Sequence, residues 1–230
     1  MYYTLIAIIH SAMLSYLDRV DKSLMLFLNF DGSPCMDLFW YQYSRMPAWI
    51  LLMIVLVMSM IYYHPGKTKD KVLMIVFIAL LITACDQISS GLIKPWVARL
   101  RPSHCPEIEH FLHYVNDYKG GQYGFVSSHA ANMVAIVTFL CCTFRDKRTR
   151  ISVILFAVLM CYSRIYLGVH YPGDILCGAV IGFILAYYGY KLLKNKLGLY
   201  TTDICPKAIN YTLYLTWAGL LWWALMHTNI

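Results

Sequence analysis

Long apolar runs separated by short polar segments dominate the pattern of hydrophobic and polar positions along the chain. The six clearest runs are Met46–Tyr63, Val72–Ile93, Ser127–Phe144, Ile151–Gly168, Ile175–Tyr190 and Ala208–Met226. A helix needs about 20 residues to cross the hydrocarbon core of a bilayer, and flanking residues and tilt complete the shorter runs. The pattern therefore predicts an all-α fold, a polytopic transmembrane helical bundle with six core spans, in one domain of residues 1–230.

The first 45 residues are less regular. Met1–Tyr16 is apolar, but it has neither the positive start nor the small-residue cleavage site of a signal peptide. Its length suits a short seventh span or an interfacial helix. The next stretch, residues 17–30, places Asp18, Arg19, Asp21 and Lys22 ahead of an apolar run, which is typical of a helix on the membrane surface. We expect residues 1–45 to form a short span or interfacial helices.

Composition supports a membrane protein. The chain of 230 residues is 60% apolar and only 13% charged, whereas a soluble domain carries about 25% charged residues. This excludes a disordered, fibrous or ordinary soluble protein. Most of the eight cysteines lie inside apolar runs, where a thiol acts as a small hydrophobe, and the cysteine spacing predicts neither a zinc site nor a disulfide framework.

The basic residues behind the net charge of +7 are concentrated on one side of the predicted membrane topology. The segments 64–71, 145–150 and 191–207 together hold 11 of the 19 Lys and Arg residues. Basic loops mark the cytoplasmic side of a membrane protein, so the segments 94–126 and 169–173 are expected on the outer side. The positive charge is therefore a topology signal, and no nucleic-acid partner is predicted.

Three polar groups lie at the ends of the spans. The first comprises Lys94, Arg99 and Arg101, and Asp86 and Ser90 precede Lys94 at intervals of four residues on one helical face. Ionisable groups at such positions are functional candidates, because burying them in a membrane is costly. The alternative for this group alone is that the cations reach the interface without any function.

The second group, Ser127, Ser128 and His129, opens a span, and a helix start offers N–H donors to an anion. An ordinary serine N-cap is the alternative. The third group contains Arg164, His170 and Asp174, and a carboxylate four residues from His170 is close enough to orient its ring. The alternatives are a membrane anchor for Arg164 and a helix-start acid for Asp174.

The predicted topology places all three groups on the same side of the membrane. Three cations, a donor-rich helix start, two histidines and one carboxylate suit phosphoryl transfer, because its transition state spreads negative charge over several oxygens. The histidines would supply a nucleophile and a general acid. Since no carboxylate cluster has the spacing of a magnesium or calcium site, neither a metal nor another cofactor is expected.

These residues resemble the signature of the type 2 phosphatidic acid phosphatase superfamily, a family of membrane lipid phosphatases. Its first motif, a lysine followed after six residues by Arg-Pro, is matched by Lys94, Arg101 and Pro102. Its third motif is matched in full by Ser163, Arg164, His170 and Asp174. The middle motif, Pro-Ser-Gly-His, is matched at Ser127 and His129, whereas Val126 replaces the proline and Ser128 replaces the glycine.

The resemblance implies a role for each matched residue. His170 would attack phosphorus and form a phosphohistidine, Asp174 would hold its tautomer, and His129 would protonate the leaving group and then activate water. The phosphate-binding set would be Lys94, Arg101, Ser127, Ser128 and Arg164, with Arg99 and Ser163 as helpers. Ser128 lacks the conformational freedom of glycine, so the amide geometry beside Ser127 is the part of the site least fixed by the resemblance.

The implied substrate is a lipid whose tail stays in the bilayer while its phosphate reaches the outer surface. Candidates are undecaprenyl diphosphate, lipid A, phosphatidylglycerophosphate and phosphatidic acid, and the first two are preferred for a bacterial inner-membrane enzyme with a periplasmic site. The segment 94–128 would be the active-site loop. Residues 103–126 within it are expected to form a solvated lid, and a source of metal ligands is the alternative. A channel or anion transporter and a catalytically silent lipid-binding member are the competing classes. The sequence does not indicate an oligomeric state.

Overall fold

The computed structural model describes residues 2–228, with side chains from residue 11 onward. Within that range the regular secondary structure is helical, and strand-like pairing is limited to two isolated bridges, Leu100 with Tyr123 and Phe144 with Thr202. The predicted all-α fold class is confirmed.

The helices follow one another with short connections except near the middle of the chain. Their bounds are α1 Tyr2–Leu28, α2 Pro34–Tyr43, α3 Ile50–Tyr63, α4 Thr68–Asp86, α5 Lys94–Val97, α6 Ser128–Thr143, α7 Lys147–Tyr166, α8 Pro172–Leu193 and α9 Lys207–His227. Short 3-10 turns occupy Met46–Trp49, Pro102–His104 and Glu109–Phe111, and a π-helical segment, Gln87–Ile93, joins α4 to α5.

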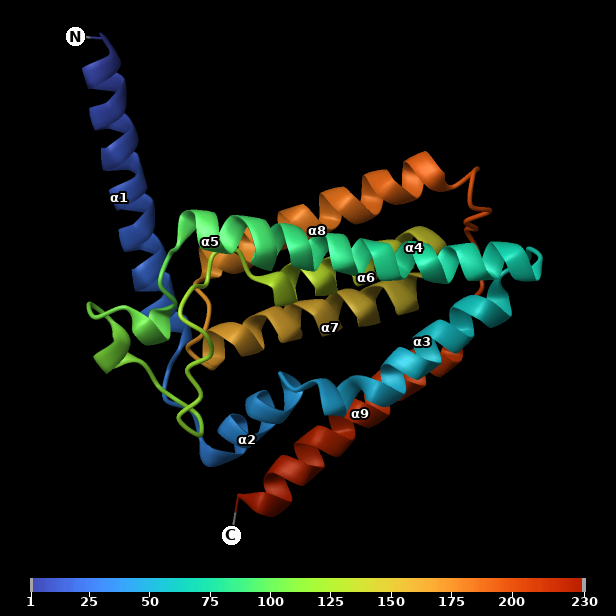
Figure 1. Ribbon diagram of the computed structural model, residues 1–230. Helices are drawn as coiled ribbons and strands as arrows, with labels where there is room; N and C mark the ends of the chain where they lie inside the picture. The colour runs from blue at the N-terminus through green and yellow to red at the C-terminus, as the bar shows by residue number, and fades with distance from the viewer. Residues whose placement is uncertain (1, 229–230) are drawn as a thin grey trace.

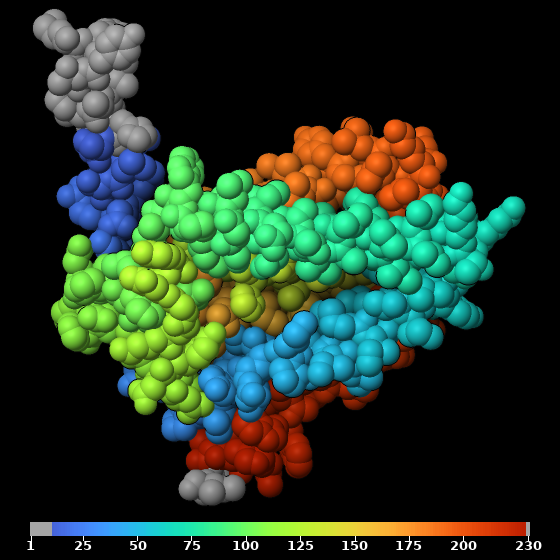
Figure 2. Space-filling model, in the orientation of Figure 1, coloured from blue at the N-terminus to red at the C-terminus, as the bar shows by residue number. Residues whose placement is uncertain are grey.

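Helices α4, α6, α7 and α8 run side by side, and α2, α3 and α9 form a second group that packs against α7 (Figure 1). The pair with the most extensive contact is α6 with α8. Helix α1 extends away from this body, and its end near Leu28 lies beside α7 and α8 (Figure 1). The loop of residues 98–127, coloured green to yellow, covers the end of the bundle next to α1 and α5 (Figure 2).

All six predicted spans are helices in the structure, but the prediction of six core spans is not confirmed. Four helical segments are long and apolar enough to cross a membrane: Met46–Tyr63, Thr68–Val97, Lys147–Tyr166 and Pro172–Leu193. Helix α6 has 16 residues and so extends about 24 Å, less than the roughly 30 Å of a hydrocarbon core. Helix α9 has 21 residues, and its tyrosine, tryptophan and asparagine residues reduce its hydropathy.

The N-terminal region differs from the expected pair of elements. Helix α1 continues without a break from Tyr2 to Leu28, because no glycine or proline precedes Gly32 to interrupt it. The expected boundary between Tyr16 and Leu17 is therefore wrong. Met1 lies outside the described residues, and the seventh span over Met1–Tyr16 stays a prediction.

The connections between helices separate the charges as the sequence predicts. The segments joining α3 to α4, α6 to α7 and α8 to α9 lie at one end of the bundle, and the 98–127 loop lies at the other (Figure 1). The first end is held together by the backbone bond from the Thr202 N–H to the Thr143 carbonyl and by the Tyr200 hydroxyl, which donates to the Met60 carbonyl. The three basic segments are therefore neighbours, and the candidate site residues lie at the opposite end.

Local sequence explains where the helices of the site begin and end. Ser127 caps α6 by accepting a bond from the Ala130 N–H, and Pro172 occupies the first turn of α8, where its missing N–H costs nothing. After α7, Gly168 adopts a φ of 73°, which glycine tolerates and which ends the helix. These three local signals explain why α6 and α8 begin, and α7 ends, at the same end of the bundle.

Two glycines allow α8 to lie directly against α6. A Cβ at Gly178 would lie 2.4 Å from the Ser127 carbonyl oxygen, and a Cβ at Gly182 would lie 2.1 Å from that of Ala131. Both distances are too short for any side chain, so the small-xxx-small spacing sets the separation of the helices. The result is that the starts of α6 and α8 meet, and the Ser127 N–H donates to the Asp174 carbonyl over 3.0 Å.

Gly182→Ala is expected to destabilise the protein, because the new methyl group overlaps the Ala131 backbone, and overpacking typically costs about 1–3 kcal/mol. Thermal unfolding of the purified protein in detergent measures the effect. Gly219→Ala in α9 is the matched control, since a Cβ there meets nothing within 4 Å. Alanine at that position is expected to be neutral or stabilising by up to about 1 kcal/mol. Equal unfolding midpoints for Gly182→Ala and the wild type would contradict the packing argument.

Candidate active site

Every site residue predicted from the sequence lies at the end of the bundle where α5, α6, α7 and α8 meet. Lys94 is the first residue of α5, and Ser127 to His129 form the N-cap and first two residues of α6. Arg164 lies in the last turn of α7, His170 precedes α8, and Asp174 lies in the first turn of α8. Arg101 reaches the same region from the loop after α5. The structure therefore brings together three motifs that span residues 94–174 of the sequence.

His170 is completely buried at the centre of this group. Its Nε2 lies 3.3 Å from Nη1 of Arg101, and because a guanidinium can only donate, Nε2 is the acceptor. The ring proton is therefore on Nδ1, which lies 3.5 Å from Oδ2 of Asp174. Burial, together with the positive charges of Arg101, Arg164 and Lys94, holds the pKa of His170 well below its ordinary value. The imidazole is accordingly neutral, with its Nε2 lone pair toward the cations.

Asp174 is also fully buried and makes four contacts. Its Oδ2 accepts a bond of 3.1 Å from the Tyr171 N–H and lies 3.5 Å from Nδ1 of His170. Its Oδ1 accepts a bond of 2.9 Å from Nη1 of Arg99. The fourth contact is the backbone bond to Ser127 described above. Asp174 thus caps α8 with the same oxygen that lies beside the imidazole, so the observed helix-start role is compatible with the predicted orienting role.

Three cations surround His170 without any acidic partner. Lys94, Arg101 and Arg164 form no salt bridge to a carboxylate within residues 11–228. Nζ of Lys94 lies 3.4 Å from Oγ of Ser90 and 3.5 Å from Oγ of Ser128. These distances agree with the predicted alignment of Lys94 with Ser90, although the segment before Lys94 is π-helical, a form often found at functional sites.

The two arginines of this set are held by neutral groups. Arg101 donates to the backbone carbonyls of Tyr123 and Val169, over 3.1 Å and 3.2 Å. Arg164 is 3% exposed and donates to the hydroxyls of Ser44 and Tyr118, while its Nε has no hydrogen-bond partner among the described residues. Burial of an uncompensated cation is costly, so a local cluster of three favours binding of an anion.

The serines and His129 occupy the start of α6. The Ser127 hydroxyl caps the helix, and the Ser128 hydroxyl lies beside Lys94, so both polar groups have structural partners. His129 is exposed, and the positive charges of Arg164, Arg101 and Lys94 disfavour its protonated form until an anion balances them.

The two helper residues have different surroundings from the phosphate-binding set. Arg99 is ion-paired with Asp18, Asp21 and Asp174 at 2.7–3.0 Å, and its guanidinium stacks 3.9 Å from the centre of the Tyr171 ring. Although burial opposes the charge, these carboxylates raise the pKa of Arg99 above its ordinary value. The Ser163 hydroxyl donates to the Met160 carbonyl within α7, so neither helper is directed at the anion site.

Tyr118 and Ser44 are site residues that sequence reasoning missed. Both contact Arg164, from the 98–127 loop and from the end of α2. Burial opposes ionisation of Tyr118, but the charges of Arg164 and Arg101 outweigh it and lower its pKa below the ordinary value. No local pattern marks either residue, because each is placed in the site by its contact with Arg164, which is distant in the sequence.

The 103–126 segment is not a freely solvated lid. Cys105, Ile108 and Leu112 are buried in a small apolar cluster with Met25 and Tyr171. Within the described residues, no three His, Cys, Asp or Glu side chains are grouped so that they could hold a metal ion. The loop is thus packed onto α1 and α8, and its acidic and histidine side chains do not form a metal cluster.

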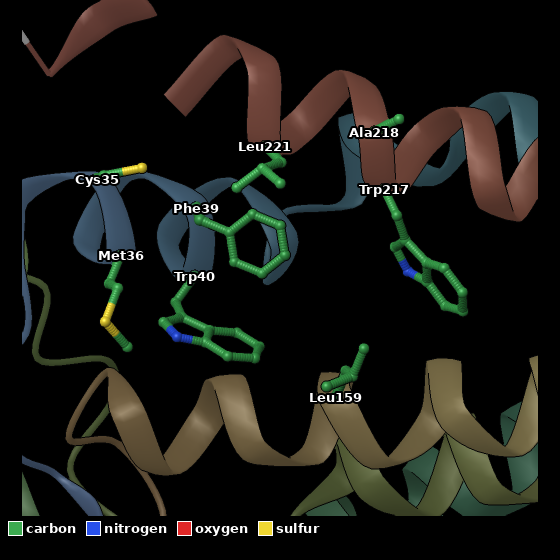
Figure 3. A pocket seen from close by; sticks show the side chains of 8 residues that line it. All are labelled: Cys35, Met36, Phe39, Trp40, Leu159, Trp217, Ala218 and Leu221. Carbon is green, nitrogen blue, oxygen red and sulfur yellow. The ribbon is translucent and has the colours of Figure 1, made fainter. Parts of the chain in front are cut away.

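Two apolar cavities lie beside α7, the helix that runs between the candidate site and the basic end of the bundle. One of about 780 Å³ lies between α6, α7 and α8, and is lined by residues such as Val137, Val158 and Phe183. The other, of about 430 Å³, lies between α2, α7 and α9. Figure 3 shows Trp40 and Phe39 on one side of it, facing Leu159 and Trp217 across the gap. Both cavities have the apolar character that hydrocarbon chains require.

Comparison with known proteins agrees with this geometry. The profile of the PAP2 superfamily matches residues 71–197. The chain is 33% identical to the lipid A 4'-phosphatase of Porphyromonas gingivalis over 84% of this chain and 81% of the relative. It is also 33% identical to the lipid A 4'-phosphatase of Bacteroides thetaiotaomicron over 94% of this chain and 100% of the relative.

Solved structures share the fold. The chain resembles the PAP2-type phosphatidylglycerolphosphate phosphatase of Bacillus subtilis with a TM-score of 0.57 at 20% identity, covering 78% of this chain and 87% of that one. It resembles Aquifex aeolicus LpxE with a TM-score of 0.53 at 22% identity, covering 74% of this chain and 93% of that one. Together with the profile match and the two phosphatases, these findings show that the chain belongs to the PAP2 superfamily and is an integral membrane lipid phosphatase.

Proposed function

We propose that this protein hydrolyses a phosphate of lipid A through a phosphohistidine on His170. One observation carries the proposal: Lys94, Arg101 and Arg164 meet around the buried imidazole of His170, and none of the three forms a salt bridge with a carboxylate in residues 11–228. A dianionic phosphate supplies the missing negative charge. The similarity to two lipid A 4'-phosphatases over most of the chain favours lipid A over undecaprenyl diphosphate.

The first chemical step uses the two histidines on opposite sides of phosphorus. Nε2 of His170 attacks phosphorus while the bond from phosphorus to the lipid oxygen breaks, and His129 gives its proton to that oxygen. Nδ1–H of His170 faces Asp174, so the carboxylate stabilises the positive charge that develops on the ring. The guanidinium groups and Lys94 balance the charge on the equatorial oxygens.

Water completes the reaction. His129, now neutral, removes a proton from a water molecule that attacks phosphorus, and the bond between phosphorus and Nε2 breaks. Inorganic phosphate leaves, and His170 returns to its neutral form. Arg101 donates to Nε2 of His170, so this bond must yield to the phosphate when substrate binds. Ser127, Ser128 and the N–H groups at the start of α6 add donors to the phosphate.

The location of the site supports a periplasmic reaction in a bacterial inner membrane. The three basic segments are gathered at the end of the bundle opposite His170 (Figure 1). Positive loops stay in the cytoplasm, so the catalytic end would face outward. The apolar cavities beside α7 are lined by hydrocarbon and aromatic side chains, and one of them would receive acyl chains while the phosphate reaches His170.

A substrate panel tests the proposal. Purified protein is mixed with lipid A, undecaprenyl diphosphate, phosphatidylglycerophosphate and phosphatidic acid, and released phosphate is measured with and without excess chelator. Lipid A is expected to give the highest kcat/KM, with no change on adding chelator. His170→Ala is expected to lower kcat by at least about 10⁴-fold, because no other group can form the covalent intermediate.

His227→Ala is the matched control, since that exposed residue stacks on Trp223 near the end of α9. It should leave turnover unchanged. A preference for another lipid would reject lipid A as substrate, and survival of activity in His170→Ala would reject the nucleophile. Binding of lipid A without turnover in the wild type would favour a silent lipid-binding protein.

The acid limb of the pH profile follows from the charge on His170. A nucleophile must be neutral, so kcat/KM falls as pH drops through the pKa of His170, which burial and Arg101 hold well below its ordinary value. In Arg101→Gln one of these positive charges is lost, the pKa of His170 rises, and the acid limb is expected to move to higher pH. The pH profile of each protein is normalised to its own maximal kcat/KM, because the Arg101→Gln variant is also expected to bind phosphate less tightly. An acid limb at the same pH in both proteins would contradict the electrostatic assignment.

A further inference from the structure

Helix α1 lies outside the segment matched by the family profile, yet it supplies two carboxylates to the site. Asp21 and Asp18 contact Nη1 and Nη2 of Arg99 at 2.7 Å and 3.0 Å. The same Nη1 of Arg99 binds Oδ1 of Asp174 at 2.9 Å. One guanidinium therefore connects the N-terminal helix to the carboxylate that faces His170.

Arg99 is consequently distinct from the cations of the anion site. Three carboxylates share its donors, whereas Lys94, Arg101 and Arg164 have none in the described part of the chain. An arginine saturated by acidic groups carries no surplus charge for a phosphate. Its fork geometry instead suits the orientation of carboxylates.

We propose that Arg99, held by Asp21 and Asp18, is a positioning residue that directs one oxygen of Asp174 at Nδ1 of His170. Arg99 occupies Oδ1, so Oδ2 is left for the Tyr171 N–H and the imidazole. Stacking on the Tyr171 ring keeps the guanidinium in place. The proposal rests on the proposed function, because it assigns Arg99 to the same reaction.

Asp21 also fixes the start of α8. Its Oδ1 accepts a bond of 2.8 Å from the Gly173 N–H, one of the free donors at the first turn of the helix. A Cβ at Gly173 would lie 2.7 Å from Oδ2 of Asp21, so the absence of a side chain allows α1 to approach. Asp21 thus holds both the backbone next to Asp174 and the arginine that binds Asp174.

The carboxylates of α1 also determine how strongly Arg99 neutralises Asp174. The Arg99 guanidinium interacts with three carboxylates, so it neutralises Asp174 only in part. Asp174 therefore keeps enough negative charge to stabilise a positively charged His170 ring. If Asp21 became neutral, Arg99 would interact more strongly with Asp174 and weaken this support in the transition state. The expected defect therefore affects kcat and leaves phosphate binding intact.

The experiment measures kcat, KM and inhibition by inorganic phosphate for full-length Asp21→Asn. The substrate is whichever lipid of the panel the wild-type protein hydrolyses. We expect kcat to fall about 10-fold or more, as is common when a group that orients a catalytic residue is lost, with KM and phosphate inhibition within about 2-fold of wild type. Glu107→Gln is the matched control, since this exposed carboxylate joins the same network only through Lys22. Its kinetics should equal those of the wild type.

A double variant separates positioning from a general structural effect. If Asp21 acts through Arg99, then Asp21→Asn combined with Arg99→Gln should lose no more activity than Arg99→Gln alone. Multiplied losses, an unchanged kcat in Asp21→Asn, or weaker phosphate inhibition in Arg99→Gln would each overturn the proposal. If Asp21→Asn does not fold, Asp18→Asn carries the same prediction with a smaller decrease, of about 3-fold, since Asp18 binds Nη2 of Arg99, the nitrogen that does not bind Asp174, and also pairs with Lys22.

These outcomes are distinguishable from failure of the proposed function. A wild type that hydrolyses a lipid other than lipid A still allows the comparison, and only the identity of the substrate is rejected. If His170→Ala were active, the covalent mechanism would fail before Arg99 is considered. If His170→Ala is inactive and Asp21→Asn retains full kcat, the proposed function stands and the positioning role is rejected.

Discussion

Helix α8 can lie against α6 because Gly178 and Gly182 have no side chains to separate them, and the rest of the site depends on this contact. It brings the Ser127 N–H within hydrogen-bond distance of the Asp174 carbonyl. The start of α6, with His129, thereby adjoins the start of α8, with His170 and Asp174. In a bilayer the hydrophobic effect does not drive helices together, so close backbone packing of this kind is a main source of specificity.

The charges at this end of the bundle fall into two sets with different electrostatic roles. Arg99 is surrounded by carboxylates from α1 and α8, so its charge is balanced within the protein. Within residues 11–228, Arg101 and Arg164 bind neutral acceptors and an imidazole, so no carboxylate pairs with their charge and an anion would balance it. Arg99 and Arg101, which are separated by a single residue, therefore have different electrostatic environments. The difference arises because Arg99 meets the acidic residues of α1 and α8, whereas Arg101 meets Tyr123, Val169 and His170 in the loops.

Much of the fold and most of the site could be predicted from the sequence. The six apolar runs are helices within a few residues of the predicted bounds, since long apolar runs and proline or serine caps are local signals. The predicted cluster of His170, His129, Lys94, Arg101 and Arg164 lies together because the topology of alternating spans brings their ends to one side. Less was predictable for α1, which is one continuous helix. The 103–126 loop likewise packs on apolar contacts that no pattern within it reveals.

The sequence by itself determined the all-helical membrane fold, the end of the bundle at which the candidate site residues gather and the residue types available there, because periodicity, charge and motif spacing are properties of neighbouring positions. Only the tertiary structure decided how those residues are paired. Arg99 is paired with acidic groups, Arg164 is held by Ser44 and Tyr118, and the helix before Lys94 widens into a π-helical turn. The reason is physical: the electrostatic role of a charged side chain depends on what surrounds it, and its surroundings here come from segments up to 120 residues away.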